Sequence, residues 1–188
     1  MNTDESHKFF GLDFKVERFQ RGIYEEHLGE ASFLFEQRAT FLASEELVWR
    51  NIGKLEDRLE SHIDGLSIGE NLVLDVCEKH ALEGDLGNLY VALSVFCRHH
   101  RDDLIFRILD QIDHEDAEKV MVVADAIKYE CPIEEVNQYL HAFSSSDRWT
   151  LFVLATVAGY RRLKGITCSV SPSAESDRRP VCSGFFEH

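Results

Sequence analysis

The chain has 188 residues, with 20 Lys and Arg against 34 Asp and Glu, which gives a formal net charge of −14. This length allows one or two small domains, and a hydrophobic content of 44% excludes wholesale disorder. The acidic balance argues against nucleic acid as a partner, because phosphates require a basic surface. The start carries no secretory pattern, and the longest nearly apolar stretch, 149–160, is too short to span a bilayer. We therefore expect a cytoplasmic protein without membrane association.

Apolar residues recur at intervals of three and four, and only three prolines interrupt the chain, so we predict an all-α fold. Residues 1–16 are expected to form an arm with apolar anchors at Phe9, Phe10, Leu12 and Phe14. A long helical hairpin is expected over 17–66, with helices at 17–42 and from 45 to about 63. Asp64 and Gly65 would end the second helix, because glycine adopts the left-handed conformation of a helix end. The predicted apolar stripe of that helix is Val48, Ile52, Leu55, Leu59, Ile63 and Leu66.

Further helix starts are indicated by local signals. Ser67 and Glu70 have the spacing of a capping box, and Asp85 and Asp113 are suitable N-caps. Proline and acidic residues favour a first helical turn, and a short polar side chain favours an N-cap. These signals predict two more starts, at Pro132 with Glu134 and Glu135, and at Ser146 or Asp147.

An internal repeat is the most informative pattern. A shift of 31 residues superimposes three segments that begin at Leu89, Val120 and Leu151. Each unit is a nearly all-apolar helix followed by an amphipathic one, which predicts a solenoid of HEAT-like helix pairs over 67–164. An ordinary helical bundle with similar hairpins is the alternative. The other matching columns are Tyr90/Met121/Phe152, Val91/Val122/Val153, Ala92/Val123/Leu154, Leu93/Ala124/Ala155, Val95/Ala126/Val157 and Phe96/Ile127/Ala158.

Residues 165–188 change in character, with serines, two prolines and no helical period, and predict a disordered or loosely attached tail. The third repeat then lacks its second helix and leaves an open apolar face. That face would meet a partner or be covered by the arm or the tail, and a homodimer through the open end is one such arrangement.

Two stretches, 23–42 and 55–66, carry a family pattern. It resembles that of bacterial proteins with HEAT-like repeats, which have no assigned enzymatic activity and are often encoded beside type VI secretion genes. Members of the family are longer, so this chain would be a short or truncated one. The resemblance implies an adaptor or chaperone-like factor of secretion. The matching residues are His27, Glu30, Ala31, Phe33, Leu34, Arg38, Leu55, Asp57, Arg58, Leu59, His62, Asp64, Gly65 and Leu66.

The polar members of this set lie near apolar seams, where an unpaired buried charge would be costly. We expect a network between the first two helices in which Glu30 pairs with Arg58 or Arg38. His62 would be held by an acidic neighbour. A structural role, setting the register of the two helices, is favoured over a binding role for these residues.

Five cysteines, an odd and scattered set, are expected to be free thiols. Two Cys-x2-His pairs, Cys77/His80 and Cys97/His100, have a spacing that places both side chains on one helix face, and four such ligands suit zinc. The competing interpretation, two core cysteines with histidines at helix ends, is preferred. We therefore expect no metal site and no cofactor.

No nucleotide-binding or hydrolase motif is present in the sequence, and its paired carboxylates fit helix starts and solvated faces. The resulting prediction is a non-enzymatic protein–protein interaction module of the bacterial cytoplasm, associated with type VI secretion. One alternative is an immunity protein whose negative charge attracts a basic toxin. A second alternative is a small metal-dependent enzyme or effector, which requires the zinc site or a carboxylate cluster.

Overall fold

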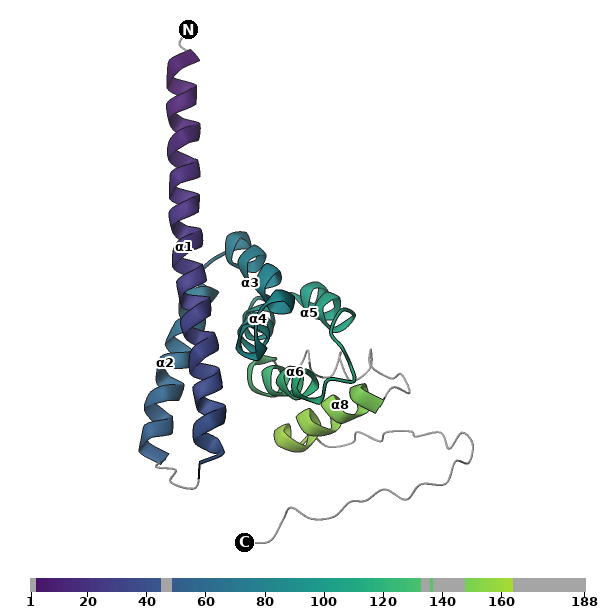
Figure 1. Cartoon of the computed structure of the whole chain (residues 1–188). Helices are drawn as coiled ribbons and strands as arrows, with labels where there is room; N and C mark the ends of the chain where they lie inside the picture. The colour runs from purple at the N-terminus through teal and green to yellow at the C-terminus, as the bar shows by residue number, and fades with distance from the viewer. Residues whose placement is uncertain (1–2, 45–48, 133–135, 137–147, 164–188) are drawn as a thin grey trace, which may run out of the picture.

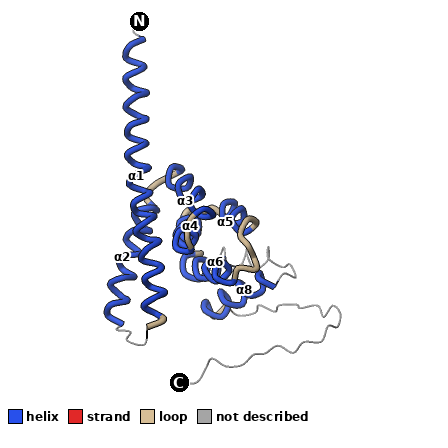
Figure 2. Tube along the Cα trace, in the orientation of Figure 1, coloured by secondary structure: helices blue, strands red, loops and turns tan. Residues whose placement is uncertain are grey.

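Helices account for almost all of the chain that the computed structural model describes, namely residues 3–44, 49–132, 136 and 148–163. Within these ranges there are seven labelled helices and no strand, so the all-α prediction is confirmed (Figure 1 and Figure 2). The helices are α1 (Thr3–Leu42), α2 (Trp49–Ser67), α3 (Asn71–Glu83), α4 (Leu86–Arg98), α5 (Asp102–Leu109), α6 (Ala117–Glu130) and α8 (Arg148–Arg161).

Helices α1 and α2 form the long hairpin. The predicted stripe of α2 is buried at Ile52, Leu55, Leu59, Ile63 and Leu66, whereas Val48 lies outside the described residues. On α1, the buried residues include Leu28, Ala31, Leu34 and Phe35. The three- and four-residue spacing of apolar side chains therefore identified the contact face of α2 correctly.

The first helix is longer than predicted. It begins at Thr3 and not at Glu17, so residues 3–16 belong to α1 and do not form a separate arm. No proline interrupts this stretch, and one glycine does not stop a helix. Phe14, one of the expected anchors, is 67% exposed and is not docked on the helices that the structure describes. The side chains of Phe9, Phe10 and Leu12 lie outside that description.

The predicted end of the second helix is also wrong. Helix α2 continues through Asp64 and Gly65 to Ser67. A Cβ atom at Gly65 would lie 2.9 Å from Cε1 of His27, so the glycine leaves room for that ring on α1. The Ser67 hydroxyl donates to the Ile63 carbonyl at 2.8 Å, and Glu70 makes no side-chain cap bond, so the capping box does not form.

Asp85 caps α4 as predicted, accepting a hydrogen bond from the Asn88 amide at 2.7 Å. The cap of α6 is Asp116, which accepts from the amides of Glu118 and Lys119. Asp113 instead accepts from the Glu115 amide at 3.0 Å in the preceding turn. Of the start predicted at Pro132, Glu134 and Glu135 lie outside the described residues, as do Ser146, Asp147 and the tail 165–188.

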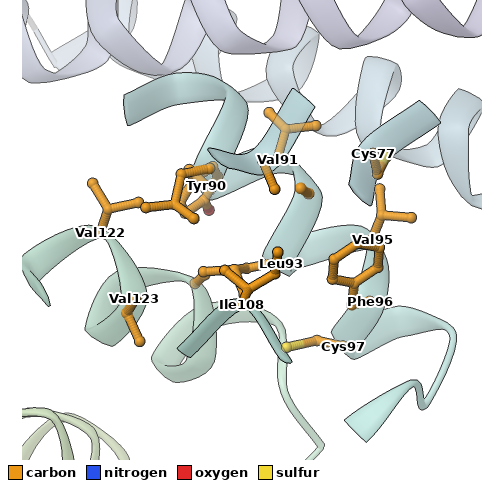
Figure 3. Close-up of a cluster of buried hydrophobic side chains, with 14 of the residues drawn as sticks. Cys77, Tyr90, Val91, Leu93, Val95, Phe96, Cys97, Ile108, Val122 and Val123 are labelled. Atoms are coloured by element: carbon orange, nitrogen blue, oxygen red, sulfur yellow. The ribbon is translucent and has the colours of Figure 1, made fainter. Parts of the chain in front are cut away.

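The core is centred on α4, which contacts α1, α2, α3, α5 and α6. Its residues from Leu89 to Cys97 are all buried (Figure 3). Gly87 allows α1 to approach closely, because a Cβ atom there would overlap the carbonyl oxygen of Ser32. Beside this crossing, the Ser32 hydroxyl donates to Asp85 at 2.6 Å, and the rings of Phe35 and Tyr90 stack with centroids 4.1 Å apart.

Helices α4, α6 and α8 can be compared by where they begin and where they end. Helices α4, α6 and α8 begin at positions 86, 117 and 148, which are 31 residues apart. Helices α4 and α8 also end alike. His100 and Arg162 follow them with φ of 55° and 52°, and the next amides reach back to the carbonyls of Phe96 and Ala158. This is the hydrogen bond of a Schellman motif, formed here without glycine.

Candidate functional site

Two hollows lie at the N-terminal ends of α4, α6 and α8, and together they are called the end groove here. The first hollow, about 350 Å³, lies between α4 and α6 and includes Leu86, Leu89 and Glu118. The second, about 730 Å³, lies between α6 and α8 and includes Val120, Trp149 and Phe152. Both volumes are in the range of sites that accept a ligand or a side-chain anchor.

The two hollows are related by the 31-residue shift. Four lining positions of the first hollow have counterparts 31 residues later in the lining of the second. The equivalent pairs are Gly84/Glu115, Leu86/Ala117, Leu89/Val120 and Glu118/Trp149.

The second hollow is largely apolar. Met121 and Phe152 in its lining are 52% and 44% exposed, although both are large hydrophobic side chains. The ring of His114 stacks on Trp149, with centroids 4.1 Å apart, and its Nε2 lies 2.7 Å from the Leu109 carbonyl oxygen. This surface suits a bulky apolar side chain, since burying it there would remove several exposed apolar groups from water.

The first hollow is more acidic. Asp85, Asp116 and Glu118 contribute carboxyl groups, and Lys119 is the basic residue among its described lining. Burial would raise the pKa of Asp85, but hydrogen bonds from Ser32 and Asn88 outweigh it and hold the pKa below its usual value. The end groove thus places negative charge next to an apolar surface.

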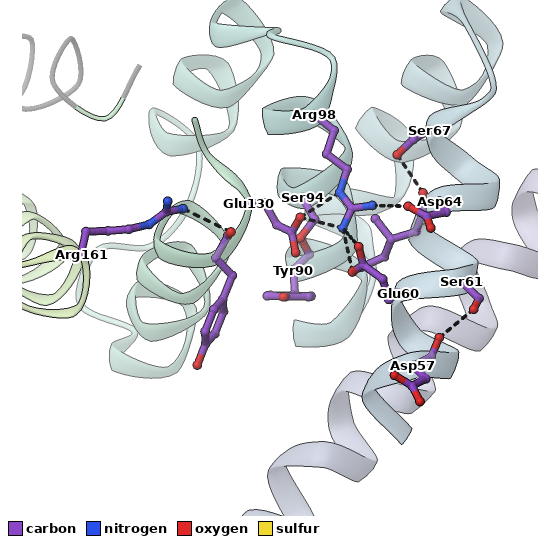
Figure 4. A network of polar contacts seen from close by, with 12 residues as sticks. Asp57, Glu60, Ser61, Asp64, Ser67, Tyr90, Ser94, Arg98, Glu130 and Arg161 are labelled. Carbon is purple, nitrogen blue, oxygen red and sulfur yellow. Dashed lines mark hydrogen bonds and ion pairs between the residues drawn. The ribbon is translucent and has the colours of Figure 1, made fainter. Parts of the chain in front are cut away.

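A separate polar cluster joins α2, α4 and α6 (Figure 4). The Arg98 guanidinium donates to Glu60 and Asp64 of α2 at 2.8 and 2.7 Å, and to Glu130 of α6 at 2.8 Å. Burial alone would lower the pKa of Arg98, but Glu130 and Glu60 raise it. Burial raises the pKa of Glu130 although Arg98 opposes this shift. Arg98 therefore connects α2, α4 and α6 through its ion pairs.

The predicted network between the first two helices is only partly correct. Glu30 lies near Arg58, but their charged atoms are 3.9 Å apart and both side chains are more than half exposed. Arg38 pairs with Glu56 at 2.9 Å and not with Glu30. Asp64, which the sequence also singled out, pairs with Arg98 of α4. Two of these pairs join α1 and α2, whereas the pair of Asp64 reaches α4.

His62 is held by a second histidine and not by an acidic neighbour. Its Nδ1 lies 3.0 Å from Nδ1 of His27, because the antiparallel hairpin places these two positions opposite each other. Burial and the proximity of His27 lower the pKa of His62, whereas Glu30 acts in the opposite direction.

The four candidate zinc ligands are not brought together. Cys77 and Cys97 are buried in the core, and burial raises the pKa of the Cys77 thiol to about 12, which opposes the thiolate form that binds zinc. His80 lies in the last turn of α3, and His100 follows α4 in a left-handed conformation. Among the described side chains, no group of three or more His, Cys, Asp and Glu is arranged to hold a metal ion. Cys77, Cys97 and Cys131 are buried and do not form a disulfide bond.

Sequence reasoning missed the end groove and Arg98. The 31-residue alignment already matched Met121 with Phe152, and the same shift pairs Glu118 with Trp149, but it did not indicate that these residues line a hollow. Arg98 carried no signal in sequence, because its three partners lie 32 to 38 residues away.

Comparisons with protein-family models, curated proteins and solved structures find no match to this chain. Among the helices that the structure describes, none is long and apolar enough to cross a membrane.

Proposed function

We propose that this chain is a non-enzymatic protein–protein interaction module. In this proposal, its helix pairs of about 31 residues stack as a HEAT-like solenoid, and the end groove receives a segment of a partner protein. The observation that carries the proposal is the end groove itself, two equivalent hollows with exposed Met121 and Phe152 beside acidic side chains. Interface centres are enriched in such aromatic and methionine side chains.

The biological setting follows the family resemblance of residues 23–42 and 55–66. On that basis, we place the module in the bacterial cytoplasm as an adaptor or chaperone-like factor of type VI secretion. A net charge of −14 also favours a second candidate, an immunity protein that binds a basic toxin. Both candidates require a protein partner, and they differ in the charge and toxicity of that partner.

The test is quantitative affinity capture from a native lysate with three forms of the full chain. These are the wild type, the groove variant Met121→Glu/Phe152→Glu, and the control Ile68→Glu. Ile68 is 82% exposed and lines neither hollow, so the control adds charge at an exposed apolar side chain outside the end groove. The proposal expects one stoichiometric partner with the wild type and the control, and its loss with the groove variant.

A purified partner then separates the two candidates. An immunity protein must neutralise a basic, toxic partner, whereas an adaptor binds a secretion component that has no toxicity. Equal capture of the partner by all three forms would overturn the assignment of the end groove as the binding surface.

A further inference from the structure

Residues 14–23 of α1 form a largely exposed segment that is basic, whereas the chain as a whole is acidic. Phe14, Val16 and Phe19 are 67%, 48% and 69% exposed. The same ten positions hold three basic residues, Lys15, Arg18 and Arg21, and one acidic residue, Glu17, within a chain of net charge −14. The segment is therefore both apolar and basic.

This segment cannot reach the end groove of its own chain. Helix α1 is continuous over 40 residues, or about 60 Å at 1.5 Å per residue. Its later part is packed in the hairpin with α2 and against α3 and α4, and its N-terminal half projects past α3, away from α6 and α8 (Figure 1). A contact between this segment and an end groove therefore requires a second molecule.

The segment and the end groove are complementary. Lys15, Arg18 and Phe19 lie at helical intervals of three and four, so they share one face of α1. Phe19 matches the apolar second hollow with Met121 and Phe152. Its two basic neighbours match the carboxyl groups of the first hollow.

We infer that residues 14–23 of α1 dock in the end groove of a second copy of this chain. Each copy provides one helix and one groove, so two reciprocal contacts close a two-fold dimer. An amphipathic helix laid in an apolar groove is a recurrent mode of recognition. The inference rests on the proposed function, because it names an occupant of the same groove.

Sedimentation velocity of the purified full chain over a range of micromolar concentrations tests this dimer. The wild type is expected to self-associate, more weakly at high salt because charge pairs contribute. Phe19→Glu and Met121→Glu should each weaken association at least about ten-fold, whereas Ile68→Glu should not. Both altered side chains are more than half exposed, so folding should persist, and circular dichroism checks this.

Mixing the two variants distinguishes the proposed contact from pairing of α1 with α1. A mixture of Phe19→Glu and Met121→Glu retains one intact helix and one intact groove, so it should dimerise more strongly than either variant alone. A Met121→Glu variant that dimerises like the wild type would overturn the inference. A wild-type chain that stays monomeric would also overturn it, but would leave the proposed function standing if Met121→Glu/Phe152→Glu still lost a captured partner.

Discussion

At the scale of single residues, the contact between His27 and His62 makes the stability of the protein depend on pH. Two Nδ1 atoms 3.0 Å apart share one hydrogen, so one ring donates and the other accepts. The two rings cannot both be protonated at Nδ1 without losing this bond. Glu30 and Arg58 are the other charged groups that act on His62.

The first prediction is that the free energy of unfolding falls as the pH drops below 6.5. Burial and His27 lower the pKa of His62 from its ordinary value of 6.5 in the folded state. Between the lowered value and 6.5 the unfolded chain binds more protons, so stability rises with pH across that window. Urea unfolding at pH 8 and at pH 5.5 measures the change. His62→Gln should reduce it, and the control His80→Gln, on α3, should not.

The second prediction concerns Arg98, whose side chain is 18% exposed and pairs with Glu60, Asp64 and Glu130. Arg98→Ala should lower the free energy of unfolding by about 3 kcal/mol, because Glu130, whose side chain is only 13% exposed, would lose its counter-charge. Arg107→Ala is the matched control. Its exposed pair with Glu78 should contribute at most about 1 kcal/mol. Equal losses of unfolding free energy for the two variants, measured by urea unfolding, would contradict the role of Arg98 in connecting the three helices.

At the scale of elements, helix faces could be predicted from sequence better than helix ends. The stripe of α2 from Ile52 to Leu66 follows from apolar spacing alone, because burial against one neighbour imposes the helical period. The end of α2 could not be predicted in this way, because Gly65 does not end the helix and instead leaves room for the His27 ring of α1. The start of α1 was misplaced because an unpacked helical turn carries no apolar stripe that distinguishes it from an arm.

The third prediction compares two glycines of helices. Gly87→Ala should destabilise the protein by about 1–3 kcal/mol, because the added Cβ overlaps the Ser32 carbonyl where α1 and α4 cross. At Gly53, in α2, an added Cβ meets no atom within 4 Å. Gly53→Ala should therefore stabilise by up to about 1 kcal/mol, as expected inside a helix. Thermal and urea unfolding of both variants check the opposite signs, and stabilisation by Gly87→Ala would refute the close crossing.

At the scale of the whole molecule, the 31-residue interval connects the sequence with the end groove. The shift that aligns α4, α6 and α8 also relates the two hollows. The interval was predicted from apolar positions along the chain, and it stays a prediction as a structural repeat. The sequence could not predict the hollows, because they depend on how the first turns of neighbouring helices are spaced. Trp149 of α8 and His114, in the turn before α6, stack although they are 35 positions apart in the sequence.

Hydrogen–deuterium exchange of the full chain, alone and with its captured partner, tests the central claim most directly. The end groove is lined by the first turns of α6 and α8, at 117–121 and 148–152. If a protein segment binds there, amide exchange should slow in these turns, while the end of α2 near Ile68 stays unchanged. Slower exchange elsewhere, with no change at 117–121 and 148–152, would contradict the account.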